Sequence, residues 1–119
     1  MDFGIFTMFS ARETSTQHEI FHEWFDVVQI AEESGIDTFW LGESHFRPHR
    51  AMLASPLIGA SAVASRTQRM QVGLAVQVLP LANPIRIAEE AAIVDHISDG
   101  RLVFGVGRSS FIESYNGYN

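Results

Sequence analysis

Strand-like and helix-like segments alternate along this chain about every 30 residues, and this alternation limits the possible folds more than any other feature. Short apolar runs typical of buried strands are expected at residues 2–8, 37–42, 70–79 and 101–106. Segments with helical periodicity are expected between them, at residues 16–34, 57–65 and 84–97. Strands separated by helices pair in parallel through right-handed crossovers. The order βαβαβαβ therefore predicts an α/β fold with a parallel sheet.

Local signals support the predicted helix boundaries. Thr16 followed by Glu19 has the spacing of a capping box, in which each residue hydrogen-bonds the other's backbone. Gly35 stands where the first helix should end, because glycine tolerates the left-handed conformation common at that position. Pro56 and Asn83–Pro84 are typical of the first turns of the next two helices.

Two architectures fit a parallel α/β pattern, and the first loop separates them. A doubly wound sheet places a glycine-rich phosphate turn after its first strand, but residues 8–12 (MFSAR) hold no such turn. A (β/α)8 barrel of TIM type has units of the observed length, about 30 residues each. The sequence therefore predicts that residues 1–119 are the N-terminal half of one barrel domain, four strands of eight.

We expect the rest of this barrel to be missing from the chain, through truncation, cleavage or completion by another polypeptide. Residues 107–119 resemble a loop, with no closing helix. A half barrel has unpaired sheet edges and an uncovered face, which parallel sheets rarely tolerate. Binding to the remainder of the barrel or to a second chain is therefore expected, as is a homo-oligomer.

Composition and charge exclude several classes of function. The formal net charge of −6 argues against a nucleic-acid-binding surface. No apolar run approaches the length of about 18 residues that spans a membrane, so no membrane association is expected. The sequence starts without a basic region or signal-type cleavage site, and it has no cysteine. A cytoplasmic protein without disulfides is predicted.

The loop after the second predicted strand carries candidate catalytic groups, since barrel enzymes place their chemistry at the carboxyl ends of strands. Glu43, His45 and His49 gather there. His45 is suited to general acid or base catalysis, or to orienting a ligand; the alternative is a loop histidine with a backbone partner. Metal binding by His45 and His49 is disfavoured because Pro48 interrupts any helix between them, and no metal site is predicted.

The third and fourth predicted strands end in residues suited to a cofactor. Arg108 and Ser109 offer a guanidinium and a hydroxyl that could hold a phosphate, although a surface arginine is the plain alternative. Small residues Gly73 and Ala75 would let a flat ring approach the backbone, although on the residues alone ordinary barrel-core packing is the favoured explanation.

Taken together, these segments resemble the bacterial-luciferase-like family of flavin-dependent monooxygenases. The similarity runs in order along essentially the whole chain. It rests on residues 1–6 (MDFGIF), 31–43 (AEESGIDTFWLGE), 72–76 (VGLAV), 79–86 (LPLANPIR) and 89–108 (EEAAIVDHISDGRLVFGVGR).

The resemblance implies an oxidoreductase that uses reduced FMN and O2 to oxidise a small organic substrate, with the flavin delivered by a separate reductase. It also leaves open coenzyme F420 and an F420-dependent oxidoreductase of the same fold. A third possibility is a non-enzymatic half barrel, and as a fragment the chain is expected to be inactive alone.

The resemblance also implies roles for single residues. Arg108 matches the position that holds the FMN phosphate, and Ser109 follows it. Ala75–Val76 matches a peptide bond that is cis beneath the flavin ring in several members. Glu43 and His45 match part of a Glu-His-His motif. Light-emitting members carry histidine in place of Ser44 and cysteine in place of Gly107, so a non-luminescent monooxygenase or an F420-linked relative is expected.

Overall fold

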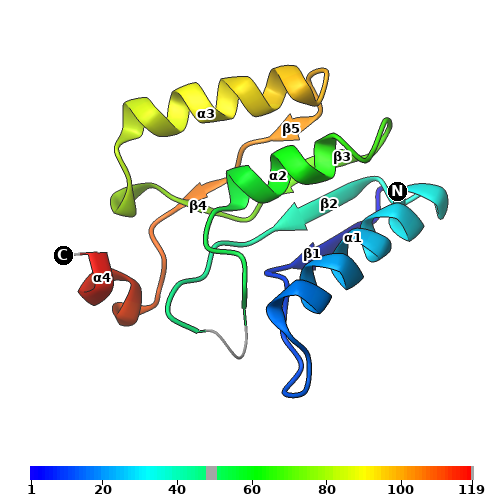
Figure 1. The fold of residues 1–119 in the computed structure, drawn as a ribbon. Coiled ribbons are helices and arrows are strands. Elements are labelled where there is room, and N and C mark those ends of the chain that lie inside the picture. Colours follow the sequence, from blue (N-terminus) through cyan, green and yellow to red (C-terminus); the bar gives the residue numbers. More distant parts are fainter. Residues whose placement is uncertain (48–50, 119) are drawn as a thin grey trace.

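The computed structural model describes residues 1–47 and 51–118, which form helices packed on a parallel sheet (Figure 1). The helices are α1 (Gln17–Glu33), α2 (Pro56–Ala64), α3 (Pro84–Ile97) and α4 (Ile112–Tyr118), with a 3-10 turn, η1, at Leu79–Leu81. The strands are β1 (Gly4–Thr7), β2 (Thr38–Leu41), β3 (Gln71–Leu74), β4 (Gln77–Val78), β5 (Leu102–Val103) and β6 (Val106–Gly107). No described helix is long and apolar enough to cross a membrane.

All described strand pairs are parallel, as the alternation predicts. The main sheet has the order β1-β2-β3-β5, and its register aligns Phe6 with Trp40 and Trp40 with Gly73. A second pair, β4 with β6, continues the same two strands beyond an interruption, with Val78 opposite Gly107. Carboxyl ends of consecutive strands consequently meet at one edge of the sheet.

One face of the sheet carries the core. Side chains in alternate positions of β2 and β3 point towards the helices and are fully buried: Phe39, Leu41, Val72 and Leu74. They form one cluster with residues from α1, α2 and α3, among them Val28, Val63 and Val94. Figure 1 shows these three helices over the same side of the sheet. Helices on one face of a parallel sheet are typical of the wall of a barrel, whereas a doubly wound sheet has helices on both faces.

The opposite face is more open and carries aromatic side chains. Phe6 is 54% exposed, and Trp40 on the neighbouring strand is partly exposed. The indole of Trp40 lies across both adjacent strands, because Gly4 and Gly73 leave room for it. A Cβ added at Gly4 would come 2.8 Å from Trp40 Nε1. In a closed barrel this face points to the interior.

The predicted helix boundaries are confirmed. Thr16 and Glu19 form the complete capping box at the start of α1. Gly35 follows the helix with a φ of 82°, in the left-handed region. Ser55 caps α2 ahead of Pro56, and the side chain of Asn83 accepts hydrogen bonds from the first amides of α3.

The third and fourth strands were each predicted as one continuous segment, which is wrong. Residues 70–79 divide into β3 and β4, with a cis peptide bond at Ala75–Val76 between them. Residues 101–106 divide into β5 and β6. The two interruptions lie side by side, since Gly105 packs so tightly on the Leu74 carbonyl oxygen that a Cβ would collide with it. Pairing resumes where the Gln77 amide donates to the Gly105 carbonyl at 2.8 Å.

The prediction of a loop over residues 107–119 is also wrong, because residues 112–118 form α4; Asn119 lies outside the described residues. This short helix lacks an apolar periodicity that the sequence could reveal. Tertiary contacts stabilise it instead: the Tyr115 hydroxyl donates to the Arg108 carbonyl, and Gly117 packs on the ring of Phe46.

A carboxylate on α1 anchors the amino end of β3. Glu32 accepts hydrogen bonds from three consecutive backbone amides, those of Gln68 (2.9 Å), Arg69 (2.8 Å) and Met70 (3.0 Å). Partial burial acts to raise the pKa of Glu32. The three amides, with a smaller effect of the Arg69 charge, outweigh it, so the pKa lies below its ordinary value.

Arg101 performs a similar role beside it. Its guanidinium donates five hydrogen bonds, to the Thr67 hydroxyl and to the carbonyls of Ala64, Thr67, Met70 and Ser98. These acceptors belong to the end of α2, the turn before β3 and the turn after α3. Arg101 therefore fixes the amino-terminal edge of the sheet, opposite the edge where barrel enzymes place their chemistry.

Candidate functional site

Loops at the carboxyl ends of β1 and β2 are joined by backbone hydrogen bonds. The Leu53 amide donates to the Met8 carbonyl at 3.1 Å, and the Ser44 amide donates to the Leu53 carbonyl at 3.0 Å. The segment after β2 thus folds back over the loop after β1. This arrangement gives the side chains that follow β2 fixed positions at the edge of the sheet.

Glu43 and His45, both predicted as catalytic residues, form a buried pair in this loop. Glu43 Oε1 lies 2.7 Å from His45 Nε2, and the two side chains are 4% and 6% exposed. The other oxygen, Glu43 Oε2, accepts from Gln77 Nε2 and from the Val78 amide, both at 2.8 Å. The carboxylate therefore ties the end of β2 to β4, directly beyond the cis peptide.

The second ring nitrogen of His45 faces α4. Tyr118 places its hydroxyl 3.2 Å from His45 Nδ1, and the two rings meet edge to face with centroids 4.9 Å apart. A carboxylate can only accept, so in the neutral ring Glu43 favours the proton on Nε2 and leaves Nδ1 to accept from the Tyr118 hydroxyl. A ligand could reach Nδ1 by taking the place of the tyrosine hydroxyl.

Gln77 is a site residue that sequence reasoning missed. Its side chain is buried, its Nε2 donates to Glu43, and its Oε1 has no donor among the described residues. A buried amide oxygen without a partner is uncommon and costs free energy. The signal was present in the sequence, because Gln77 is a polar residue near the carboxyl end of a predicted strand that is mostly apolar.

The predicted cofactor residues surround the strand interruptions. Ala75 is exposed and Val76 is partly buried at the end of β3. Arg108 is exposed directly after β6, and Ser109 follows with a left-handed φ of 61°. The structure thus places Glu43 and His45 in contact. Arg108 and Ser109 lie at the end of the neighbouring strand, and no hydrogen bond within the described ranges joins them to that pair.

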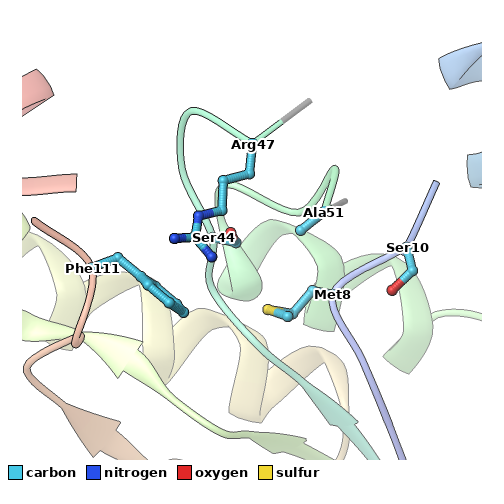
Figure 2. Close-up of a pocket in the computed structure, with 6 residues that line it drawn as sticks. All are labelled: Met8, Ser10, Ser44, Arg47, Ala51 and Phe111. Carbon is cyan, nitrogen blue, oxygen red and sulfur yellow. The ribbon is translucent and has the colours of Figure 1, made fainter. Parts of the chain in front are cut away.

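Two adjacent hollows open at this edge. The first, about 360 Å³, is lined by Met8, Ser10, Ser44, Arg47, Ala51 and Phe111 (Figure 2). The second, about 510 Å³, shares three of these residues and extends to His45 and Tyr118. Arg47 faces both hollows and was not predicted as a site residue. Its position two residues after His45, in a loop beyond a strand end, was the available signal.

Backbone strain gathers in the same loops. Phe9, Phe46 and Ser109 follow β1, β2 and β6, and each has a left-handed φ between 54° and 61°. Such a conformation costs a non-glycine residue on the order of 1–3 kcal/mol, and it is common near functional sites. The described residues hold no group of three metal-ligating side chains, and His49 lies outside them.

Comparison with known proteins agrees with this geometry. The sequence profile of luciferase-like monooxygenases matches residues 1–119. Limonene 1,2-monooxygenase of Rhodococcus erythropolis is 36% identical over 107 residues, covering 90% of this chain and 27% of that protein. The oxygenase component of the flavin-dependent trigonelline monooxygenase of Acinetobacter baylyi is 31% identical over 116 residues. This match covers 97% of this chain and 32% of that protein.

The fold of this chain also matches that of a solved monooxygenase structure. The oxygenating constituent of 3,6-diketocamphane monooxygenase from Pseudomonas putida, in complex with FMN, superposes with a TM-score of 0.90. Its sequence identity is 18%, and the match covers 100% of this chain and 33% of that one.

This chain spans about a third of the length of the proteins it matches. Its four successive strand–helix segments superpose on about a third of the solved monooxygenase structure. This superposition confirms the predicted partial (β/α)8 fold. The family profile covers every residue from the first strand to the end of α4. By its sequence and by the fold that carries its strand-end residues, the chain belongs to the luciferase-like monooxygenase family.

Proposed function

We propose that this chain supplies part of the active site of a flavin-dependent monooxygenase, which oxidises a small organic substrate with reduced FMN and O2. The observation that carries the proposal is the buried Glu43–His45 pair, held at the carboxyl edge by the strand segment directly after Ala75–Val76. The related proteins named above support it, since one is described as flavin-dependent and another is a complex with FMN.

The residues at this edge fit a flat ring with a phosphate tail. Ala75 and Val76 offer a small apolar platform, partly open to solvent. Gly107 packs closely on Val76, since a Cβ at that position would come 2.6 Å from Val76 Cγ2. Arg108 is an exposed cation at the end of β6, suited to a phosphate, and Ser109 adds a hydroxyl.

When bound, FMN would supply the oxygen chemistry, and the protein would position and shield it. The contribution of His45 is a proton held on Nε2 by Glu43 and an acceptor at Nδ1 that a substrate could use in place of Tyr118. The contribution of Glu43 is to fix the orientation of that ring, because its other oxygen is held by Gln77 and the Val78 amide.

The remaining parts of the proposal concern the whole protein. Residues 1–119 are proposed as the N-terminal part of a single barrel domain whose other strands complete the site. We further propose a cytoplasmic homo-oligomer that receives reduced flavin from a separate reductase.

Flavin titration of the full-length protein tests this function. Arg108→Ala should weaken FMN binding about 10- to 150-fold, because losing a charge-assisted phosphate pair costs about 1.5–3 kcal/mol. Arg86→Ala is the matched control, since it removes the same charge from an exposed arginine on α3. His45→Ala should reduce kcat far more than FMN affinity. Unchanged affinity in Arg108→Ala would remove that residue from the site.

The same titration separates the alternatives. Binding of coenzyme F420 in place of FMN would favour a deazaflavin-dependent oxidoreductase of the same fold. Failure of the full-length protein to bind either would contradict the enzymatic proposal and favour a non-enzymatic barrel.

A further inference from the structure

The hollow beside β1 and β2 is lined by an arginine, Arg47, whose guanidinium donors have no hydrogen-bond acceptor among the described residues. Within residues 1–47 and 51–118, the Arg47 guanidinium makes no hydrogen bond. Its nearest carboxylate oxygen, Glu113 Oε1, is 3.6 Å from a guanidinium nitrogen, longer than a hydrogen bond. Arg101 is the contrast, since its donors make five hydrogen bonds to the protein.

Neighbouring residues hold the Arg47 side chain in place. Its Cζ lies 3.8 Å from the centroid of the Phe111 ring, a cation–π contact, and the side chain is 27% exposed. The preceding residue, Phe46, has a left-handed φ of 56° and packs against Gly117 of α4. Figure 2 shows the guanidinium between Phe111 and Ser44, facing the hollow. Its orientation is therefore fixed before any ligand binds.

The other lining residues indicate the kind of ligand. Ser10 and Ser44 carry hydroxyls, whereas Met8, Ala51 and Phe111 present apolar atoms. A volume of about 360 Å³ is in the range of small-molecule sites. A planar guanidinium matches the two oxygens of a carboxylate, which the serine hydroxyls can supplement.

We propose that Arg47 binds the carboxylate of an acidic organic substrate and thereby determines the substrate class of this enzyme. The inference rests on the proposed function, because it makes this hollow the substrate side of the flavin site. An apolar body of the substrate packs on Met8 and Phe111. Glu113, 53% exposed, is then a competing carboxylate that an incoming substrate displaces from Arg47.

Calorimetric titration of the full-length protein with benzoate and with its neutral analogue benzamide tests the inference. Wild-type protein should bind benzoate at least about tenfold more tightly than benzamide, the ratio expected for one charge-assisted contact. Arg47→Met should lower the ratio of benzoate affinity to benzamide affinity to about one without changing benzamide affinity. Arg47→Lys should give a ratio between those of Arg47→Met and wild type. Arg86→Met, which removes an exposed cation on α3, should leave the ratio unchanged.

Glu113→Gln provides a result that misfolding cannot imitate. Removing the competing carboxylate should strengthen benzoate binding several-fold, whereas a purely structural Arg47–Glu113 pair would give no gain. A wild-type protein without preference for benzoate, or an equal preference in Arg47→Met, would overturn the inference.

Parallel FMN titrations separate this inference from the proposed function. If Arg47→Met weakens FMN binding at least tenfold and leaves the benzoate ratio intact, Arg47 holds the flavin phosphate and the inference fails. If the protein binds no FMN but keeps an Arg47-dependent benzoate preference, the proposed function fails and the carboxylate site stands.

Discussion

Replacing Glu32 by glutamine tests how strongly one carboxylate stabilises the amino end of β3. In the native protein its two oxygens accept from three amides at 2.8–3.0 Å. Glutamine keeps one acceptor, so two bonds lose their charge assistance. The third bond is lost, because an NH2 group then faces the Met70 amide. Hydrogen bonds to charged groups contribute about 1.5–3 kcal/mol each and neutral ones about 1 kcal/mol. Two weakened bonds and one lost bond would sum to about 2.5–7 kcal/mol in a fully buried site. Because Glu32 is only partly buried, solvent screening reduces this value, and we expect a loss of about 2–4 kcal/mol in the free energy of unfolding.

The effect should depend on pH in a direction set by the lowered pKa of Glu32. A carboxylate whose pKa is lower in the folded protein than in the unfolded chain stabilises the fold at pH values above the unfolded pKa. That stabilisation disappears as the pH falls through the folded pKa. The difference in unfolding free energy between wild type and Glu32→Gln should thus have its largest value at pH 7 and decrease steadily below about pH 4.5.

Urea unfolding of the full-length protein, followed by circular dichroism between pH 3 and pH 7, measures this difference. Glu33→Gln is the matched control, because it removes the same charge from an exposed neighbour on α1 whose carboxylate makes no hydrogen bond to the described residues. A difference between Glu32→Gln and wild type below about 0.5 kcal/mol at pH 7 would refute the reasoning, since such values are ordinary for surface changes. So would a difference that does not change with pH.

Three further substitutions probe the edges of the sheet. Arg101→Met should lower the unfolding free energy by about 3–5 kcal/mol in the same assay, because it leaves several carbonyls without their donor; a loss as small as that of an exposed arginine would contradict this. Gly105→Ala should destabilise by about 2 kcal/mol or more, since its Cβ collides with the Leu74 carbonyl, and a stable variant would show that the strand can shift. Tyr118→Phe should keep the fold but speed diethylpyrocarbonate modification of His45, measured by peptide mass spectrometry; an unchanged rate would mean that the hydroxyl does not protect the ring.

The sequence predicted the parts of the fold that depend on local signals. Helix ends at Thr16, Gly35 and Asn83 follow from side chains that hydrogen-bond or turn the adjacent backbone, so local patterns were sufficient. The divided strands and α4 depend on contacts between distant residues, such as Gly105 with Leu74 and Gly117 with Phe46. Such contacts have no periodicity, and a single sequence does not display them.

The candidate site was predictable to a similar extent. Glu43 and His45 stand beyond a strand end, a position that indicates function in a barrel, and the structure adds their direct contact, which the sequence did not predict. Gln77, Arg47 and Tyr118 were missed, because each reaches the site through a kink, a left-handed turn or a helix that the sequence did not reveal. The roles of Arg108 and Ser109 stay predictions.

A crystal structure of the full-length protein with FMN tests the central claim most directly, namely that the carboxyl edge of this sheet forms the flavin site. The account predicts the flavin ring against Ala75–Val76 and its phosphate within hydrogen-bonding distance of Arg108. A flavin bound at the amino-terminal edge near Arg101, or with its phosphate away from Arg108, would contradict it.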